Sequence, residues 1–419
     1  MTATTVELGA VERRPFREVW VISIGHALTH WYPATFYLLL PLIGKELGLS
    51  YSEIGSILTF QYTAGAIANV PGGIFVDTVG RKALLMAVSL CWIGFPYLIM
   101  GLSHAYGMML VCATLVGIGN NLWHPTAIPW LGERFPDRKG LVMSFHGMGG
   151  NVGDAVAPLA IGLLLQSFNW RSVVIMNVVP GIVVAVILLL YVGRLQRVDP
   201  HDHPGTAKSG GLNGAERLRA LASLLKSRAL LTLAIGAAFR SLTQGALLAF
   251  LPLYLAREMG YPSLWIGACM FALQAAGFLA APIAGHLSDM IGRRQIIMSS
   301  MSMTGVVILF MAFAGGTAWF VLLVAVLGFF LFAVRAVLQA WLLDATPPGM
   351  GGSAIGLLFG TQAAGAALGP ISAGIVADHY GLMAAFYFLA ATIIVANLMV
   401  FITPAGLTQK QPLPNRVGA

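Results

Sequence analysis

The chain has 419 residues, of which 58% are hydrophobic and only 10% are charged, and its mean hydropathy of +0.81 is too high for an ordinary soluble protein. At about 20 apolar residues for each spanning helix, the chain has room for about a dozen membrane spans. Its net charge of +8 comes mostly from bases placed between apolar runs, which argues for a membrane protein and against nucleic-acid binding. The three cysteines all lie in apolar runs, which excludes a disulfide framework or a metal–thiolate site.

Twelve apolar runs, each long enough for one spanning helix, follow a polar N-terminal segment. They lie at about residues 17–43, 52–75, 83–102, 106–131, 141–166, 171–193, 228–256, 262–286, 293–314, 316–343, 353–376 and 382–404. The expected organisation is a cytoplasmic N-tail at 1–16, a six-helix half at 17–193, a cytoplasmic linker at 194–227, a second six-helix half at 228–404 and a cytoplasmic C-tail at 405–419. Within the linker, residues 215–225 are predicted to form a short amphipathic helix.

A short polar motif occurs once in each half. Its frame is G-x-x-x-D-x-x-G-[RK]-[RK], and Asp289 in the second copy follows Asp77 in the first by 212 positions. The two copies consist of Gly73, Asp77, Gly80, Arg81 and Lys82, and of Gly285, Asp289, Gly292, Arg293 and Arg294. A second pattern has the same offset, since Gly153, Pro158 and Gly162 correspond to Gly365, Pro370 and Gly374. Two patterns at one spacing predict a duplicated secondary transporter whose site lies between the halves near mid-membrane.

The distribution of lysine and arginine predicts the orientation. With twelve spans and both termini on one side, that side receives nineteen bases and the other side only three, while Arg240 and Arg335 fall inside spans. By the positive-inside rule, both termini are expected in the cytoplasm of a multi-pass protein of the cell's inner membrane.

Twelve spans, a long central loop and the duplicated motif resemble the major facilitator superfamily of transporters. Residues 117–125, G-I-G-N-N-L-W-H-P, and residues 149–153, G-G-N-V-G, are similar to the fosmidomycin-resistance branch, which exports drugs. The resemblance implies an all-α membrane fold of two pseudo-symmetric six-helix halves that works by alternating access. It also implies energy from a proton gradient and no bound cofactor. We expect a monomer in the lipid bilayer whose partners are a small-molecule substrate and protons.

In this superfamily the duplicated motif implies contacts between the halves. Asp77 would meet the start of the eleventh span near residues 352–353, and Asp289 the start of the fifth span near residues 139–140. An aspartate there can accept hydrogen bonds from exposed amides at a helix start, where the helix dipole is positive. Such contacts would form when the cytoplasmic side is closed and break when it opens. The alternative is a tight turn that only anchors positive charge at the membrane surface.

Polar side chains inside spans are costly and are functional candidates by default. Spans one, four, seven and ten, which line the central cavity in this superfamily, each carry a polar pair one helical turn apart. The predicted substrate site comprises His26, His30, Tyr37, Asn120, His124, Arg240, Gln244, Arg335 and Gln339.

The two intramembrane arginines suggest what the site binds. A guanidinium group matches carboxylate, phosphate or phosphonate oxygens with two parallel hydrogen bonds, so Arg240 and Arg335 predict an anionic substrate. The alternative is that each arginine pairs with a helix carbonyl or with a buried acid such as Asp154.

Proton coupling has two leading candidates, Asp154 and His146, which lie two turns apart in the fifth span. Carboxylic acids inside membrane spans are typical of proton relays. His26, His30 and His124 compete for this role, because imidazole titrates near neutral pH.

Several functions therefore stay open. The leading hypothesis is a proton-coupled antiporter for efflux of a small polar, anionic or amphiphilic compound, including antibiotics. The runner-up is a proton-coupled importer of an organic anion. Less favoured are a transition-metal transporter, which the clustered histidines would suit, and a receptor without transport. No nucleotide-binding loop, nucleophile motif or zinc pattern occurs in a suitable context, so we expect no enzymatic activity and no resident metal.

Overall fold

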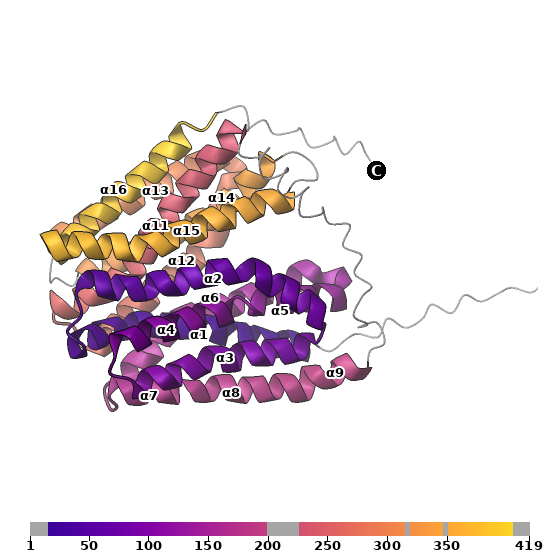
Figure 1. Cartoon of the computed structure of the whole chain (residues 1–419). Coiled ribbons are helices and arrows are strands. Elements are labelled where there is room, and N and C mark those ends of the chain that lie inside the picture. The colour runs from indigo at the N-terminus through magenta and orange to yellow at the C-terminus, as the bar shows by residue number, and fades with distance from the viewer. Residues whose placement is uncertain (1–15, 199–225, 315–318, 347–350, 405–419) are drawn as a thin grey trace, which may run out of the picture.

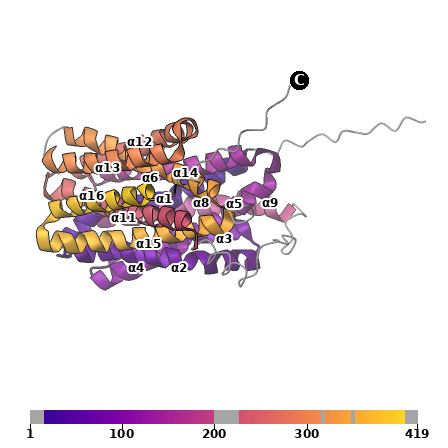
Figure 2. The same ribbon diagram turned by 90° about the horizontal axis from the view of Figure 1, so that it is seen from above.

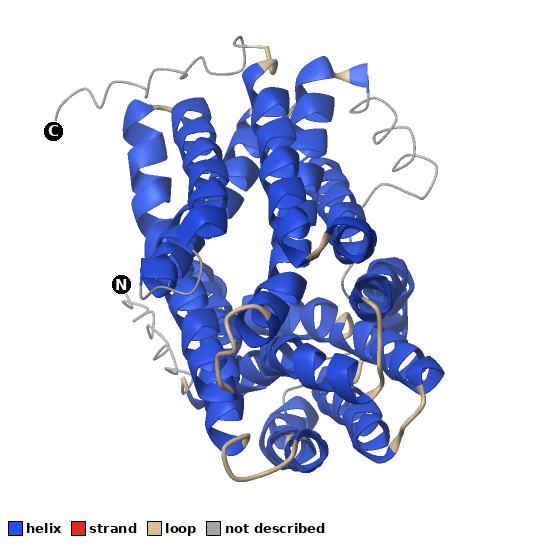
Figure 3. Cartoon of the chain, turned by 90° about the vertical axis from the view of Figure 1, so that its left-hand side faces the viewer, coloured by secondary structure: helices blue, strands red, loops and turns tan. Residues whose placement is uncertain are grey.

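A computed structural model of the chain describes residues 16–198, 226–314, 319–346 and 351–404. All regular structure in these ranges is helical, as Figure 3 shows. The expected all-α fold is thereby confirmed. The two tails and the amphipathic helix expected at residues 215–225 lie outside the described residues.

In the N-terminal half, every expected apolar run is helical over most of its length. Its helices are α1 (Arg17–Glu46), α2 (Tyr51–Val79), α3 (Lys82–Leu102), α4 (Tyr106–Asn120), α5 (Trp123–Arg134), α6 (Lys139–Leu164), α7 (Trp170–Met176), α8 (Val178–Ile187) and α9 (Gly193–Val198). A 3₁₀ turn, η1 (Pro136–Arg138), precedes α6, and a π-helical turn, η2 (Leu188–Val192), joins α8 to α9. The last span therefore continues as helix into the predicted linker.

The C-terminal half repeats this arrangement with unbroken helices. They are α11 (Arg228–Arg257), α12 (Ser263–Ile291), α13 (Arg293–Ala314), α14 (Trp319–Asp344), α15 (Gly351–Tyr380) and α16 (Leu382–Phe401). In Figure 1 this half lies above the N-terminal half, and its helices slope away from that half toward the right.

Eight helical segments of the described chain are long and apolar enough to cross a membrane by length and composition alone. They are Lys82–Leu102, Trp170–Gln196, Arg228–Arg257, Ser263–Ile291, Arg293–Met311, Trp319–Asp344, Ala354–Tyr380 and Leu382–Phe401. The other four expected spans, all in the N-terminal half, are also helical, and the fourth consists of the two shorter helices α4 and α5. Eight helical segments of the described chain thus qualify as membrane spans, and the full count of twelve stays a prediction.

Glycines end the two helices that carry the duplicated motif. Gly80 stops α2 with φ of 65°, and Gly292 stops α12 with φ of 109°. Residues with a side chain rarely adopt such positive φ angles, so both turns require glycine. This explains the second glycine of each motif copy and lets the following helix begin at Lys82 or Arg293.

The fourth span is broken close to its midpoint. The helix is interrupted at residues 121–122, where the Asn121 side chain donates to the Gly117 carbonyl at 3.0 Å. Pro125 follows and has no N–H to continue the helical hydrogen-bond pattern. The break lies just before His124, which is in the first turn of α5.

The buried apolar core shows which ends of the two halves meet. One large cluster contains residues of both halves, including Leu40 and Ile54 of the first and Leu251 and Ala377 of the second. A second cluster belongs to the C-terminal half alone, and a third to the N-terminal half alone. We call the end of the bundle with the α1–α2 and α11–α12 turns the closed end. The opposite end, with the α2–α3 and α12–α13 turns, is the motif end.

At the closed end the halves touch backbone to backbone. Helix α2 packs against α15 and α6 against α12, and Figures 1 and 2 both place α15 beside α2. The Asp378 carboxylate accepts hydrogen bonds from the Tyr51 amide at 2.7 Å and the Ser52 amide at 2.9 Å. The Thr59 hydroxyl donates to a carbonyl of α15 at 2.6 Å, and the Arg257 guanidinium lies 4.9 Å from the centre of the Tyr51 ring.

At the motif end the halves lie apart. A Cβ atom added at Gly73, Gly140, Gly285 or Gly356 would meet no atom of the described residues within 4 Å. Asp289 pairs with Arg293 of its own half at 2.6 Å and is 63% exposed, so it does not reach residues 139–140 here. The side chains of Asp77 and residues 351–353 lie outside the described part of the structure. The role of the motif as a latch therefore stays a prediction.

Loss of the Asp378 carboxylate is expected to loosen the closed end. Asp378→Ala removes two hydrogen bonds at the start of α2, which we expect to cost about 1 kcal/mol. The ratio of conformations should then shift roughly fivefold toward those in which the two halves separate at this end. Pulsed electron paramagnetic resonance between labels on the α1–α2 and α15–α16 turns measures this. Asp137→Ala, at the motif end, is the matched control. Unchanged distances in Asp378→Ala would contradict the prediction.

Candidate functional site

A cavity of about 840 Å³ lies between the two halves, and residues from both halves line it. Eight of the nine predicted substrate-site residues lie in its wall: His26, His30, Asn120, His124, Arg240, Gln244, Arg335 and Gln339. Tyr37 also borders the cavity, where its hydroxyl lies 2.6 Å from that of Tyr62. All nine predicted residues therefore share one cavity.

Glycines in α6 bring this helix against α1. A Cβ atom added at Gly149 or Gly153 would clash with the backbone of α1 at Ser23 or Ala27. The close approach places His146 and Asp154 of α6 against His26 and His30 of α1. Gly149 and Gly153 thus allow the two helices to approach closely enough for their ionisable side chains to come into contact.

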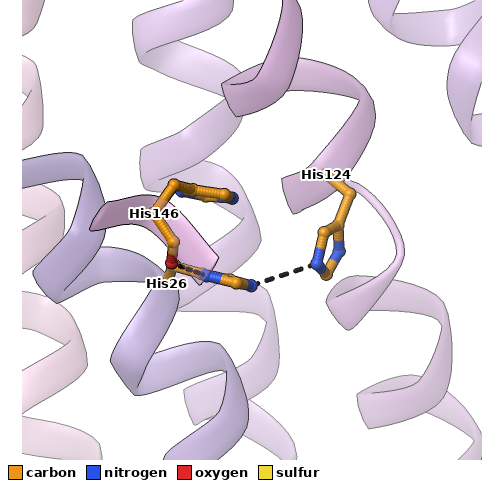
Figure 4. A group of neighbouring side chains, drawn as sticks. All are labelled: His26, His124 and His146. Carbon is orange, nitrogen blue, oxygen red and sulfur yellow. Dashed lines mark hydrogen bonds between the residues drawn. The ribbon is translucent and has the colours of Figure 1, made fainter. Parts of the chain in front are cut away.

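Four neighbouring histidines lie on the N-terminal side of the cavity, with His26, His30 and His124 in its wall and His146 behind them. His26 Nδ1 lies 2.6 Å from the His146 carbonyl oxygen, and His26 Nε2 lies 3.1 Å from His124 Nε2, as Figure 4 shows. The His146 ring stacks on the His26 ring with centroids 3.9 Å apart. His30 stands edge-on to His26 at 4.7 Å.

Asp154 pairs with His30 and not with His146. Its Oδ2 lies 2.8 Å from His30 Nδ1, and both side chains are 28% exposed. His146 is 4% exposed and contacts His26. The two proton candidates of the fifth span therefore lie in different surroundings, one at the cavity surface and one behind it.

Arg240 is 2% exposed although it carries a guanidinium group. Its Nη2 donates to Gln244 Oε1 at 2.6 Å and to the Leu331 carbonyl at 3.2 Å. The alternative interpretation, in which the arginine pairs with a helix carbonyl, is therefore correct for this one nitrogen. Its buried Nε has no hydrogen-bond partner among the residues that the structure describes. A buried cation with an unused donor at a cavity wall favours an anionic ligand.

Arg335 is exposed at the cavity wall on α14, one turn from Gln339. Among the described residues that line the cavity, Asp154 is the sole carboxylate, and it is engaged by His30. The C-terminal wall therefore presents two arginines without an acidic partner from the described chain.

Sequence reasoning missed several cavity residues, because it considered ionisable groups and helical pairs only. They are Gln61, Tyr62, Asn121, Asn151, Gln274 and Gln362. Their signal was a polar amide or hydroxyl inside an apolar run. In addition, Gln274 follows Tyr62 by the same 212 positions as the duplicated motif, which would have paired these two.

Filling the space at Gly150 is expected to disturb the histidine cluster. A Cβ atom there would lie 2.8 Å from His26 and 3.0 Å from His30, whose rings are held by further contacts. We expect Gly150→Ala to destabilise the protein by about 1–3 kcal/mol relative to Gly147→Ala. Gly147 is the matched control, because a Cβ atom there meets nothing within 4 Å. Thermal unfolding in detergent compares the two, and equal stabilities would contradict the prediction.

The chain belongs to the Major Facilitator Superfamily, a family of membrane transporters. The family model matches residues 22–280 and 233–417, which together span both halves. This assignment agrees with the all-helical fold, the membrane-spanning segments and the central cavity between two halves.

Two curated relatives align over most of the chain. The fosmidomycin resistance protein of Escherichia coli (strain K12) is 24% identical over 391 residues, 93% of this chain and 93% of that protein. The hexuronate transporter of Bacillus subtilis (strain 168) is 23% identical over 379 residues, 87% of this chain and 89% of that protein. The expected likeness to the fosmidomycin-resistance branch is thereby confirmed. The names of the two relatives indicate different substrates, however.

Among solved structures, a bacterial homolog of the human lysosomal transporter Spinster, in an inward-facing and unoccupied conformation, has the same fold. Its TM-score is 0.72 at 16% identity, and the match covers 93% of this chain and 96% of that chain.

Proposed function

We propose that this protein is a proton-coupled antiporter that exports a small organic anion across the cell's inner membrane by alternating access. The substrate carries a carboxylate, phosphate or phosphonate group. Both termini lie in the cytoplasm, so the motif end is the cytoplasmic end and the cavity is open to the cytoplasm in this conformation. An exporter loads its substrate from that side.

One observation carries the proposal. Arg240 and Arg335 border the central cavity, and no carboxylate of the described C-terminal half lines that cavity beside them. A cation inside a membrane protein is costly without a partner. An anion that enters the cavity supplies that partner directly to the exposed guanidinium of Arg335 and, as a nearby negative charge, to the buried Arg240.

The proton site is the pair of Asp154 and His30, opposite the arginines in the same cavity. The groups that face Asp154 are His30 and Tyr37 of α1 and Tyr62 of α2, with the two arginines on the facing half. Anion and proton therefore bind on separate halves. Release of the proton from Asp154 would leave a carboxylate for His30 to pair with, and entry of the anion would neutralise the arginines.

Transport into proteoliposomes tests the proposal independently of how the protein inserts. Antiport accumulates the anion when the lumen is acidic, because protons leaving the lumen drive anion entry. We expect accumulation of some members of a panel of small phosphonates and sugar acids under this gradient, and none of their neutral amides. Accumulation of neutral and acidic compounds alike would refute the anion preference.

A second function, proton-coupled import of an organic anion, is favoured by the relative named as a hexuronate transporter. A hexuronate is a carboxylate, which the same arginines would bind. The same assay separates the two functions, since symport accumulates the anion when the exterior is acidic. Accumulation under that gradient alone would replace the export proposal with import.

A further inference from the structure

Three imidazole groups from three helices converge beside the cavity, and the transport proposal above uses none of them. They belong to His26 of α1, His124 of α5 and His146 of α6, and one ring nitrogen of each lies within 4.8 Å of the others (Figure 4). We propose that these three side chains bind one divalent transition-metal ion of borderline softness, such as Zn²⁺, Co²⁺ or Ni²⁺.

The hydrogen bond of His26 prepares it as a ligand. Its Nδ1 lies 2.6 Å from the His146 carbonyl, which can only accept, so Nδ1 carries the proton and Nε2 presents a lone pair. Metal-binding histidines usually donate their second ring N–H to a carbonyl or carboxylate in this way. The carbonyl comes from another ligand residue, which ties the positions of the two side chains together.

The spacing of His26 and His124 suits a shared ion. Their Nε2 atoms are 3.1 Å apart, and two nitrogens bound tetrahedrally to zinc at about 2.0–2.1 Å lie about 3.4 Å apart. Without an ion, His124 donates a hydrogen bond to His26. An ion replaces that bond once the proton of His124 moves to Nδ1, a change of tautomer that needs no movement of the backbone.

His146 distinguishes a metal site from a simple hydrogen-bonded pair. Its side chain is 4% exposed, and within the described part of the chain neither Nδ1 nor Nε2 has a hydrogen-bond partner. Leaving a buried polar group unpaired costs about 1–3 kcal/mol. In Figure 4 its ring lies parallel to that of His26, and both point toward His124. The lone pairs of two parallel rings do not meet, so binding of an ion requires the His146 ring to rotate out of this stack. The ion then uses the nitrogen that the hydrogen-bonded pair leaves unused.

The site has access and an open position. His26 and His124 line the cavity, so an ion can enter from it. Three protein ligands leave the fourth tetrahedral position of zinc free for water or another oxygen ligand. The site does not rest on the proposed transport function, because ion binding needs no organic anion.

Metal titration of the purified protein, with any polyhistidine tag removed, tests the proposal without transport. We expect one Co²⁺ per chain with the visible absorption of tetrahedral cobalt. His26→Gln, His124→Gln and His146→Gln should each weaken binding at least about tenfold. His104→Gln and His379→Gln, which alter exposed histidines elsewhere, are the matched controls.

X-ray absorption of the zinc-loaded wild-type protein provides a second measurement that does not depend on the folding of any variant. Three imidazole nitrogens at about 2.0–2.1 Å are expected. A zinc ion bound only by oxygen would overturn the proposal. Unchanged cobalt affinity in all three folded cluster variants would do the same.

Discussion

Arg335→Gln is expected to weaken binding of the anionic substrate by about 10- to 100-fold, with a parallel loss of transport at low substrate concentration. The exposed guanidinium of Arg335 has no acidic partner among the described cavity residues, so its hydrogen-bonding capacity is available to the ligand. A hydrogen bond to a charged group contributes about 1.5–3 kcal/mol, and glutamine loses both the charge and the fork of donors. Equilibrium binding to protein in detergent measures the effect.

Comparison variants separate charge from geometry. Arg335→Lys keeps the charge but cannot make two parallel bonds, so we expect an intermediate affinity. Arg194→Gln removes an exposed arginine of α9, outside the cavity, and should leave binding unchanged. Arg240→Gln should also weaken binding, but it removes bonds to Gln244 and Leu331 and is interpreted only after its thermal stability is known. Wild-type affinity in a folded Arg335→Gln protein would argue against an anion at this wall.

The fold was predictable because its signals are local and repeated. Long apolar runs require helices in a membrane, and the constant offset of 212 residues revealed two equivalent halves. The break between α4 and α5 was not predicted, because it depends on a side-chain bond of Asn121 in addition to the nearby proline. Nor could the sequence indicate which end of the bundle is closed, since one chain must adopt more than one arrangement during transport.

The residues of the site were easier to predict than their partners. His26, Arg240 and Arg335 were identified as ionisable groups inside apolar runs. Burying such a group in lipid is costly whichever side of the helix it lies on, so its presence in a span indicates a function. The pairing of Asp154 with His30 depends on the rotation of α6 against α1, which glycine packing decides and helical spacing within one span does not reveal. His146 and Asp154 lie two turns apart in α6, yet they contact different residues, His26 and His30, because of the same packing.

Asp154→Asn is expected to abolish transport driven by a pH gradient while exchange of substrate across the membrane continues. Asparagine has nearly the shape of the protonated acid and still offers an oxygen to His30, but it cannot release a proton. The site can then bind and reorient with its substrate without moving a proton in return. We expect at least a tenfold loss of gradient-driven accumulation, whereas exchange of labelled against unlabelled substrate should change by less than about threefold.

The two assays together identify the role of the residue. A variant that merely disrupts the cavity would lose accumulation and exchange alike, and Asp137→Asn, an exposed acid at the motif end, should lose neither. His30→Gln removes the partner of Asp154 but leaves the carboxylate, so accumulation should be impaired without complete loss. Wild-type accumulation by Asp154→Asn would exclude Asp154 as the proton carrier and move the search to His30. Separation of accumulation from exchange at Asp154, together with weakened binding in Arg335→Gln, would place proton and anion on opposite walls of one cavity.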